Sequence, residues 1–414
     1  MKFKKNLKFS PKNNIVSILD IGSSKIVCLI ASIIADKVQI LGIGCHSANG
    51  FKNCNITNNK LAKMSIISAV DQAEKAAGIT IENIVLALNG NKIQSHYIKP
   101  GLILKKNKVS DGDIFSIIGK GIKELEKQGY EVIHYFPLEY IVDDNNGILD
   151  PTGLLGNKLS ARIHFVTIAS SMLENIINCL ASCQLNVEDC VFAPYAAAIA
   201  TLNETDKEFG STLIDFGSGL TSYAIFTQNN MVNCGFIPVG GAAITNDIAK
   251  SFMLDYASAE RIKTLHGSAN IFATDYEMIN YKLDSADNDE RNILKSELNH
   301  VINARLEETL TLLKTLLDKH NNLATNAKHN LVIIGGGSQL NGITAEVTRL
   351  FKTKVKLGKT IAFPGMAQGS VNASIAPALG VVQYLLEKRV KKSSNIANKD
   401  PLIVRIFNWL KENF

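Results

Sequence analysis

Residues 17–44 read SILDIGSSKIVCLIASIIADKVQILGIG, and residues 211–240 read STLIDFGSGLTSYAIFTQNNMVNCGFIPVG. Each stretch begins with an apolar strand that ends in Asp–x–Gly–Ser, and a second strand, a polar turn and a third strand follow. Chance rarely reproduces both the turn and the spacing of its flanking hairpin. The repeat therefore predicts an α/β fold in which one strand–turn–strand unit is built twice.

The two Asp–x–Gly–Ser turns carry groups that can hold phosphate. Glycine allows the backbone to turn tightly between two strands, and the amides and hydroxyls next to it can contact phosphate oxygens. A lysine in the first turn could add a point charge. The candidate phosphate-binding residues are Gly22, Ser23, Ser24 and Lys25 in the first turn, and Gly217, Ser218 and Gly219 in the second.

Two carboxylates and a third glycine turn complete the candidate site. Asp20 and Asp215 end their strands, and we expect them to face each other across a cleft and hold Mg²⁺ through water. The third turn, IIGGGSQL, follows another apolar strand and allows close backbone approach to an adenosine. Its candidate residues are Gly335, Gly336, Gly337 and Ser338. Each turn alone could be an ordinary β-turn, but three of them, each after an apolar strand, favour a nucleotide site.

Size and composition exclude several other classes of protein. A chain of 414 residues with 46% hydrophobic and 20% charged residues indicates a globular protein of two or more domains. The net charge of +6 is concentrated near the two ends, so we expect no nucleic-acid partner. The seven cysteines have no metal-ligand or CxxC spacing, which predicts reduced, structural thiols. We expect neither a signal peptide nor a transmembrane helix.

The remaining pattern predicts further elements in order. Helices are expected at about 61–77, 112–128 (after the cap-like Ser110), 172–184, 194–202 and 372–388, and strands at 84–88, 161–170 and 331–334. Residues 91–163 have a different texture, with short strands and turn signals. Residues 241–320 are expected to be mostly helical.

The last fourteen residues, PLIVRIFNWLKENF, predict an amphipathic helix. Its apolar face comprises Leu402, Ile403, Ile406, Phe407, Trp409, Leu410 and Phe414. Such a helix could pack on the protein's own core, but the polar, basic segment before it favours a tether that lies in a membrane interface next to anionic lipid.

The order of the three turns resembles the actin–Hsp70–sugar-kinase superfamily, and within it the chain most resembles FtsA, the bacterial cell-division actin homologue. The resemblance runs nearly end to end and includes VLALNG, FIPVGGAAITNDIAKSF, AERIKTLHG and the amphipathic end. It implies an actin-like (ribonuclease H-like), duplicated two-domain fold with an inserted subdomain, 1C. The implied division is subdomain 1A at 1–90, 164–200 and 365–388; 1C at 91–163; 2A at 201–242 and 310–364; 2B at 243–309; a linker at 389–400; and a membrane-targeting helix at 401–414.

The resemblance also implies a role. An FtsA-like protein binds ATP with Mg²⁺, forms filaments with itself, and ties FtsZ to the cytoplasmic face of the inner membrane at the division septum as a peripheral protein. Subdomain 2B would bind the C-terminal tail of FtsZ, with Arg305 and Glu308 at matching positions, and 1C would help recruit later division proteins. Without a partner, Arg305 and Glu308 would form an ordinary ion pair on one helix face.

The sequence departs from related ATPases in ways that affect catalysis. Ser218, Leu220 and Ser222 replace a glycine, a threonine and an aspartate of the second turn in many relatives. Ala193 stands before Pro194, where Hsp70-like and MreB-like members have a glutamate that orients the attacking water. We therefore identify no catalytic residue and expect ATP binding with at most slow hydrolysis.

Two alternatives share the superfamily. A sugar kinase would carry a long substrate-domain insertion, which we do not find. A pilus-assembly relative would keep the nucleotide turns but would lack the tethered amphipathic end at residues 389–414.

Overall fold

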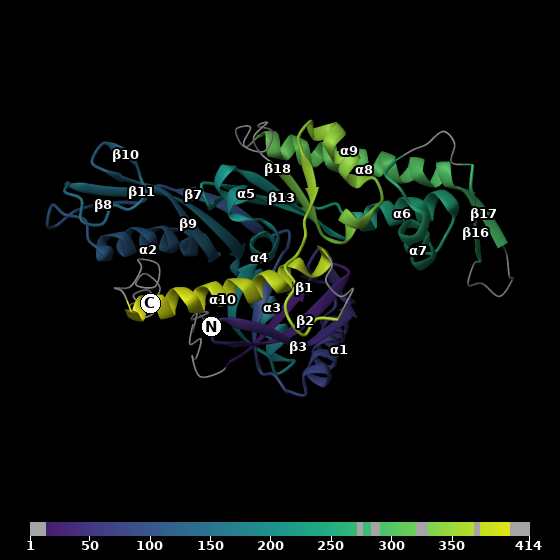
Figure 1. Cartoon of the computed structure of the whole chain (residues 1–414), viewed down its shortest axis with the longest axis horizontal. Coiled ribbons are helices and arrows are strands. Elements are labelled where there is room, and N and C mark those ends of the chain that lie inside the picture. Colours follow the sequence, from purple (N-terminus) through teal and green to yellow (C-terminus); the bar gives the residue numbers. More distant parts are fainter. Residues whose placement is uncertain (1–13, 271–275, 283–289, 320–329, 368–372, 398–414) are drawn as a thin grey trace.

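The computed structural model describes residues 14–270, 276–282, 290–319, 330–367 and 373–397. Two halves of the same design form the body, and two further units lie at opposite ends of the long axis (Figure 1). The predicted amphipathic end, 401–414, lies outside the described residues.

The two halves are built on sheets of the same topology. The first sheet has the order β12-β6-β1-β2-β3, and the second has the order β15-β14-β13-β18-β19, which matches the first when read in reverse. In each sheet the first two strands of the repeat form an antiparallel hairpin, β1 with β2 and β13 with β14. A later strand then pairs in parallel with the first strand of that hairpin, β6 with β1 and β18 with β13. The predicted duplication is confirmed. The strands are β1 (Ile15–Ile21), β2 (Lys25–Ile34), β3 (Lys37–Ser47), β6 (Asn83–Leu88), β12 (Asn186–Phe192), β13 (Ser211–Phe216), β14 (Thr221–Thr227), β15 (Asn230–Ile237), β18 (Asn330–Ile334) and β19 (Val355–Leu357).

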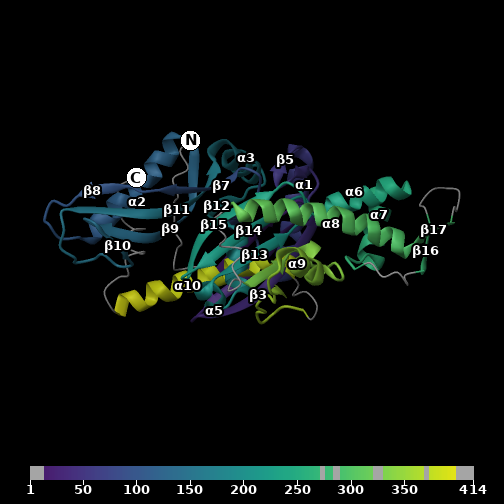
Figure 2. The same cartoon turned by 90° about the horizontal axis from the view of Figure 1, so that it is seen from above.

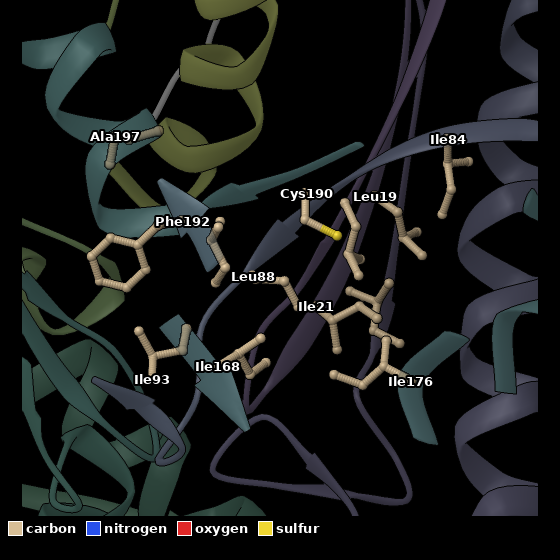
Figure 3. Close-up of a cluster of buried hydrophobic side chains, with 14 of the residues drawn as sticks. Leu19, Ile21, Ile84, Leu88, Ile93, Ile168, Ile176, Cys190, Phe192 and Ala197 are labelled. Carbon is tan, nitrogen blue, oxygen red and sulfur yellow. The ribbon is translucent and has the colours of Figure 1, made fainter. Parts of the chain in front are cut away.

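Helices cover both faces of the first sheet, which explains why its strands are apolar on both sides. In β1, Leu19 and Ile21 face a core formed with α1 and α3, whereas Val16 and Ile18 face one formed with α10. Figure 3 shows Leu19, Ile84 and Cys190 converging from neighbouring strands. The helices are α1 (Asn59–Ala77), α3 (Ser170–Ala181), α4 (Ala193–Thr201) and α10 (Ala376–Ala397), and α10 is preceded by the 3-10 turn η2 (Ala373–Ile375).

The second sheet packs on helices on one face and on the first half on the other. Its outer face forms a core with α8 and α9. Its inner face contributes Leu213, Phe226 and Ile334 to the cluster that also holds Ala197 of α4, so one continuous core joins the halves. The elements are α5 (Glu204–Phe209), α8 (Lys295–Asp318), the 3-10 turn η1 (Gly336–Gln339) and α9 (Ile343–Phe351).

The segment of different texture folds as an inserted unit with its own core. Helix α2 begins at the predicted cap, where the Ser110 hydroxyl accepts from the Asp113 amide and the Asp113 carboxylate accepts from the Ser110 amide. The unit also contacts the second half, because the Tyr97 hydroxyl donates to the Val232 carbonyl at 2.6 Å. Its elements are β7 (Ile93–Ile98), β8 (Gly101–Ile103), α2 (Asp111–Lys127), β9 (Tyr130–Val142), β10 (Asn145–Ile148) and β11 (Lys158–Ala169).

A mainly helical unit lies at the other end of the molecule, where α6, α7 and the start of α8 share a small core (Figure 2). The expectation of mostly helical sequence is correct for the helices α6 (Gly241–Phe252), α7 (Tyr256–His266) and α8, but it missed the hairpin of β16 (Met278–Lys282) and β17 (Glu290–Leu294). Another short hairpin, β4 (Phe51–Lys52) and β5 (Asn55–Ile56), joins β3 to α1.

The prediction of a linker from residue 389 is wrong at its start, because α10 continues to Ala397. No proline or glycine interrupts residues 388–400, and lysine and arginine are good helix formers. Side-chain contacts also hold this part of the helix to the first half. The Lys388 ammonium lies 2.9 Å from the Asp189 carboxylate, and the Arg389 guanidinium donates to the Ile33 carbonyl at 2.8 Å. None of the described helices is long and apolar enough to cross a membrane.

Candidate nucleotide-binding site

The two Asp–x–Gly–Ser turns close in the same way. The Gly22 amide donates to the Lys25 carbonyl at 3.0 Å, and the Gly217 amide donates to the Leu220 carbonyl at 3.1 Å. A Cβ at either glycine would lie 2.8 Å from that carbonyl oxygen, so a side chain would force the turn open. The duplicated sequence therefore produces the same tight turn in both halves.

The turns of the two halves meet. A Cβ at Gly219 would lie 2.8 Å from the Ser23 hydroxyl oxygen, although the two residues are far apart in sequence. Ser24 is exposed beside this contact, and Ser218 is half-buried. The structure thus brings the first and second turns into contact at Ser23 and Gly219.

The carboxylates of Asp20 and Asp215 interact with each other at the ends of β1 and β13, which lead into the first and second turns. The pKa of Asp20 is raised to about 7, mainly by burial and also by the negative charge of Asp215, against the opposing charge of Lys25. Burial likewise raises the pKa of Asp215 to about 6, against the opposing charge of Lys25. The Lys25 ammonium also donates to the Ser374 hydroxyl. When both carboxylates are ionised, the single lysine leaves a net negative charge at this place. A divalent cation would neutralise that charge.

The third turn joins the second through close backbone contacts. Gly335 has φ +86°, and a Cβ there would lie 2.4 Å from an Asp215 carboxylate oxygen. A Cβ at Gly337 would lie 2.0 Å from the Phe216 ring, whereas one at Gly336 would meet nothing within 4 Å. Gly336 therefore borders open space, as expected of backbone that a ligand approaches. Ser338 differs from its prediction, because it is 3% exposed and its hydroxyl donates to the Gly335 carbonyl, which makes it part of the turn itself.

The start of α6 adds groups that the sequence analysis did not assign. The Gly241 and Ala242 amides donate to the Gly217 and Ser218 carbonyls, each at 2.9 Å. The Lys263 ammonium then donates to the Gly241 carbonyl at 3.2 Å and pairs with Glu260 at 2.7 Å. The AERIKTLHG segment contains this Glu–x–x–Lys spacing, which places both side chains on one helix face, but their proximity to the second turn depends on tertiary packing.

The structure places Ala193, which stands before Pro194, and the nearby acid Asp189. Ala193 is buried at the first position of α4. Asp189, one of the nearby acids in sequence, is instead paired with Lys388 of α10.

The candidate partner residues belong to a small ion-pair network. Arg305 on α8 forms ion pairs with Asp247 of α6 and with Glu308 one turn further along α8. The structure thus shows the ion pair that the sequence predicted and adds a third member from a neighbouring helix.

Replacing Asp20 with asparagine should stabilise the nucleotide-free protein, and the gain should be more than twice as large at pH 8 as at pH 5. The pKa of Asp20 is about 7 in the folded state against 3.8 for an exposed aspartate, so the folded state loses stability as the pH rises between these values. Removing the charge should recover up to about 4 kcal/mol of unfolding free energy. Thermal melting in EDTA at both pH values tests this. The control is Asp71→Asn, because the Asp71 side chain is exposed on α1. A shift of equal size at both pH values would contradict it.

Comparison with known proteins agrees with this geometry. The model of the family described as cell division protein FtsA matches residues 212–380, and the model of the SHS2 domain inserted in FtsA matches residues 90–167. The cell division protein FtsA of Agrobacterium fabrum is 28% identical, covering 98% of this chain and 96% of that protein. That of Pseudomonas aeruginosa is 29% identical, covering 96% and 97%.

Solved structures share the fold at low sequence identity. The PilM-PilN type IV pilus biogenesis complex has a TM-score of 0.65 at 14% identity, covering 90% of this chain and 98% of that chain. MreB5 of Spiroplasma citri bound to ADP has a TM-score of 0.55 at 13% identity, covering 94% and 100%.

The duplicated sheets and the junction of three glycine turns define an actin-like protein with an inserted SHS2 unit. Within that class, the chain belongs to the FtsA family of cell-division proteins.

Proposed function

We propose that this chain binds ATP and Mg²⁺ at the junction of its three glycine turns and works as a membrane-attached filament protein in division. The convergence of the turns from both halves around Gly336, which borders open space, carries this proposal. Asp20 and Asp215 would hold Mg²⁺ through water, and Lys25 would face the phosphates. The MreB5 structure that shares this fold is bound to ADP, and a second is bound to AMPPNP.

The role in division follows from family membership over nearly the whole chain. The filament would tie FtsZ to the cytoplasmic face of the inner membrane at the septum, and the inserted unit would help recruit later division proteins. The units of the fold suggest the corresponding subdomains: 1C for the insertion and 2B for the α6–α7 unit with the start of α8. Attachment would use residues 401–414, which follow α10 after residues 398–400.

Pelleting with vesicles of anionic lipid tests the proposal as a whole. The protein should pellet weakly alone and more strongly with Mg-ATP, because a filament multiplies a weak membrane contact. It should then carry a labelled FtsZ tail peptide into the pellet. A protein that stays in the supernatant under all of these conditions would contradict the proposal.

Reversing the charge of Arg305 should weaken binding of the FtsZ tail by about tenfold. Arg305→Glu would remove the positive charge from this site and place three acids together, with Asp247 and Glu308, which should act mainly by slowing association. Titration of the tail peptide measures the effect, and unchanged ATP affinity would show that the cleft is intact.

Arg349→Glu is the matched control. Like Arg305, Arg349 pairs with two acids, in this case Glu307 and Glu346, but it belongs to α9. Equal tail affinity in the two variants would show that Arg305 is only an ion-pair residue.

A further inference from the structure

The short β4–β5 hairpin has an unusual tip. Asn53 and Cys54 have φ of +50° and +59°, so both residues of the two-residue turn are left-handed. Asparagine tolerates this conformation, but cysteine adopts it at a cost. The sequence analysis assigned no role to this segment.

The tip lies where the two phosphate turns meet. A Cβ at Gly219 of the second turn would lie 2.5 Å from the Asn53 side-chain oxygen and 2.8 Å from the Ser23 hydroxyl of the first turn. The Cys54 thiol lies 3.4 Å from the same hydroxyl. The hairpin tip therefore touches both turns of the candidate phosphate site from outside them, the second through Asn53 and the first through Cys54.

The hairpin is held firmly while the Asn53 carboxamide is left available. The Asn55 side chain donates to the Asn53 carbonyl at 3.1 Å and to the Asn91 side chain at 2.8 Å. Cys54 is 4% exposed, which anchors the tip, whereas Asn53 is half-buried. Within the ranges that the structure describes, no group hydrogen-bonds to the Asn53 carboxamide. A constrained turn thus presents an unused polar group beside Gly219 of the second phosphate turn.

We propose that the Asn53 carboxamide contacts the terminal phosphate of a bound nucleoside triphosphate. This inference rests on the proposed nucleotide function. The third turn, which would face the adenosine, contacts the Asp215 and Phe216 end of the second turn, whereas Asn53 contacts Gly219. The carboxamide therefore lies at the phosphate end of the site. Its NH₂ group can donate to a phosphate oxygen, a charge-assisted bond that ADP would lack, but an amide cannot serve as a general base.

Asn53→Gly tests the contact without straining the turn, because glycine accepts a positive φ more easily than asparagine does. The variant and the parent are titrated with Mg-ATP and with Mg-ADP. ATP affinity should fall about tenfold or more, the size of one lost hydrogen bond to a charged group, while ADP affinity stays within about twofold. Asn53→Asp, which adds a negative charge at the same place, should weaken ATP binding further still.

Asn229→Gly is the matched control, because Asn229 occupies the same kind of turn between β14 and β15 with φ +61°. It should change neither affinity. An unaltered preference for ATP over ADP in Asn53→Gly, or an equal loss for both nucleotides, would overturn the inference while leaving the nucleotide site in place. A parent protein that binds neither nucleotide would overturn the proposed function as well.

Discussion

Replacing Gly336 with valine is expected to reduce ATP affinity at least a hundredfold and to leave the melting temperature of the nucleotide-free protein unchanged. A Cβ at Gly336 meets no atom within 4 Å, so the folded protein has room for the side chain. Bound adenosine would need the same space, because glycine backbone permits an approach that a branched side chain blocks. A hundredfold loss corresponds to about 2.7 kcal/mol of binding free energy.

Two other glycines make this experiment specific. Gly112, near the start of α2, also has room for a Cβ atom, since the nearest atom is the Ser110 hydroxyl oxygen at an ordinary contact distance of 3.7 Å. Gly112→Val should therefore be folded and bind ATP normally. Gly337→Val would instead collide with the Phe216 ring and should lower the melting temperature. Undiminished ATP affinity in Gly336→Val would show that the nucleotide lies elsewhere.

The sequence was sufficient for the parts of this fold that are determined locally. The duplicated hairpins, their glycine turns and the Ser110 cap are encoded within a few residues, and all are present in the structure. By contrast, β12 was missed because Glu188 and Asp189 interrupt its apolar pattern. It is a strand because it pairs in parallel with β6, and the charge of Asp189 is met by Lys388.

The same contrast between local signals and long-range packing applies to the candidate site. Its individual turns could be predicted because glycine and strand patterns are local signals. Their convergence could only be inferred from the duplication, because Ser23 and Gly219 belong to different halves. Asn53, Glu260 and Lys263 could not be assigned, since their positions depend on how the β4–β5 hairpin and α7 pack against those turns. The continuation of α10 past residue 388 was missed for the same reason. The contacts of Lys388 and Arg389 that help to hold it join residues far apart in the sequence.

Replacing Trp409 with glutamate is expected to reduce vesicle binding of the unassembled protein at least tenfold. Trp409 is the protein's single tryptophan and lies near the centre of the predicted apolar face. Burial of a large apolar side chain contributes roughly 1.5–3 kcal/mol, and about 1.4 kcal/mol is a tenfold change in partitioning. The glutamate also resists entry into hydrocarbon, so the loss should exceed that of the ring alone.

Asn408→Glu gives the matched control, because it adds the same charge to the adjacent residue on the predicted polar face. That variant should retain most of the parent's vesicle binding, apart from a modest loss from repulsion by anionic lipid. Both variants should keep the parent's melting temperature and ATP affinity if residues 401–414 act as a tether beyond α10. If the segment is instead part of the core, Trp409→Glu would lower the melting temperature and the parent would not pellet with vesicles. Co-sedimentation and melting of the same three proteins therefore separate a membrane helix from a core helix, and the second outcome would remove the attachment step from the proposed function.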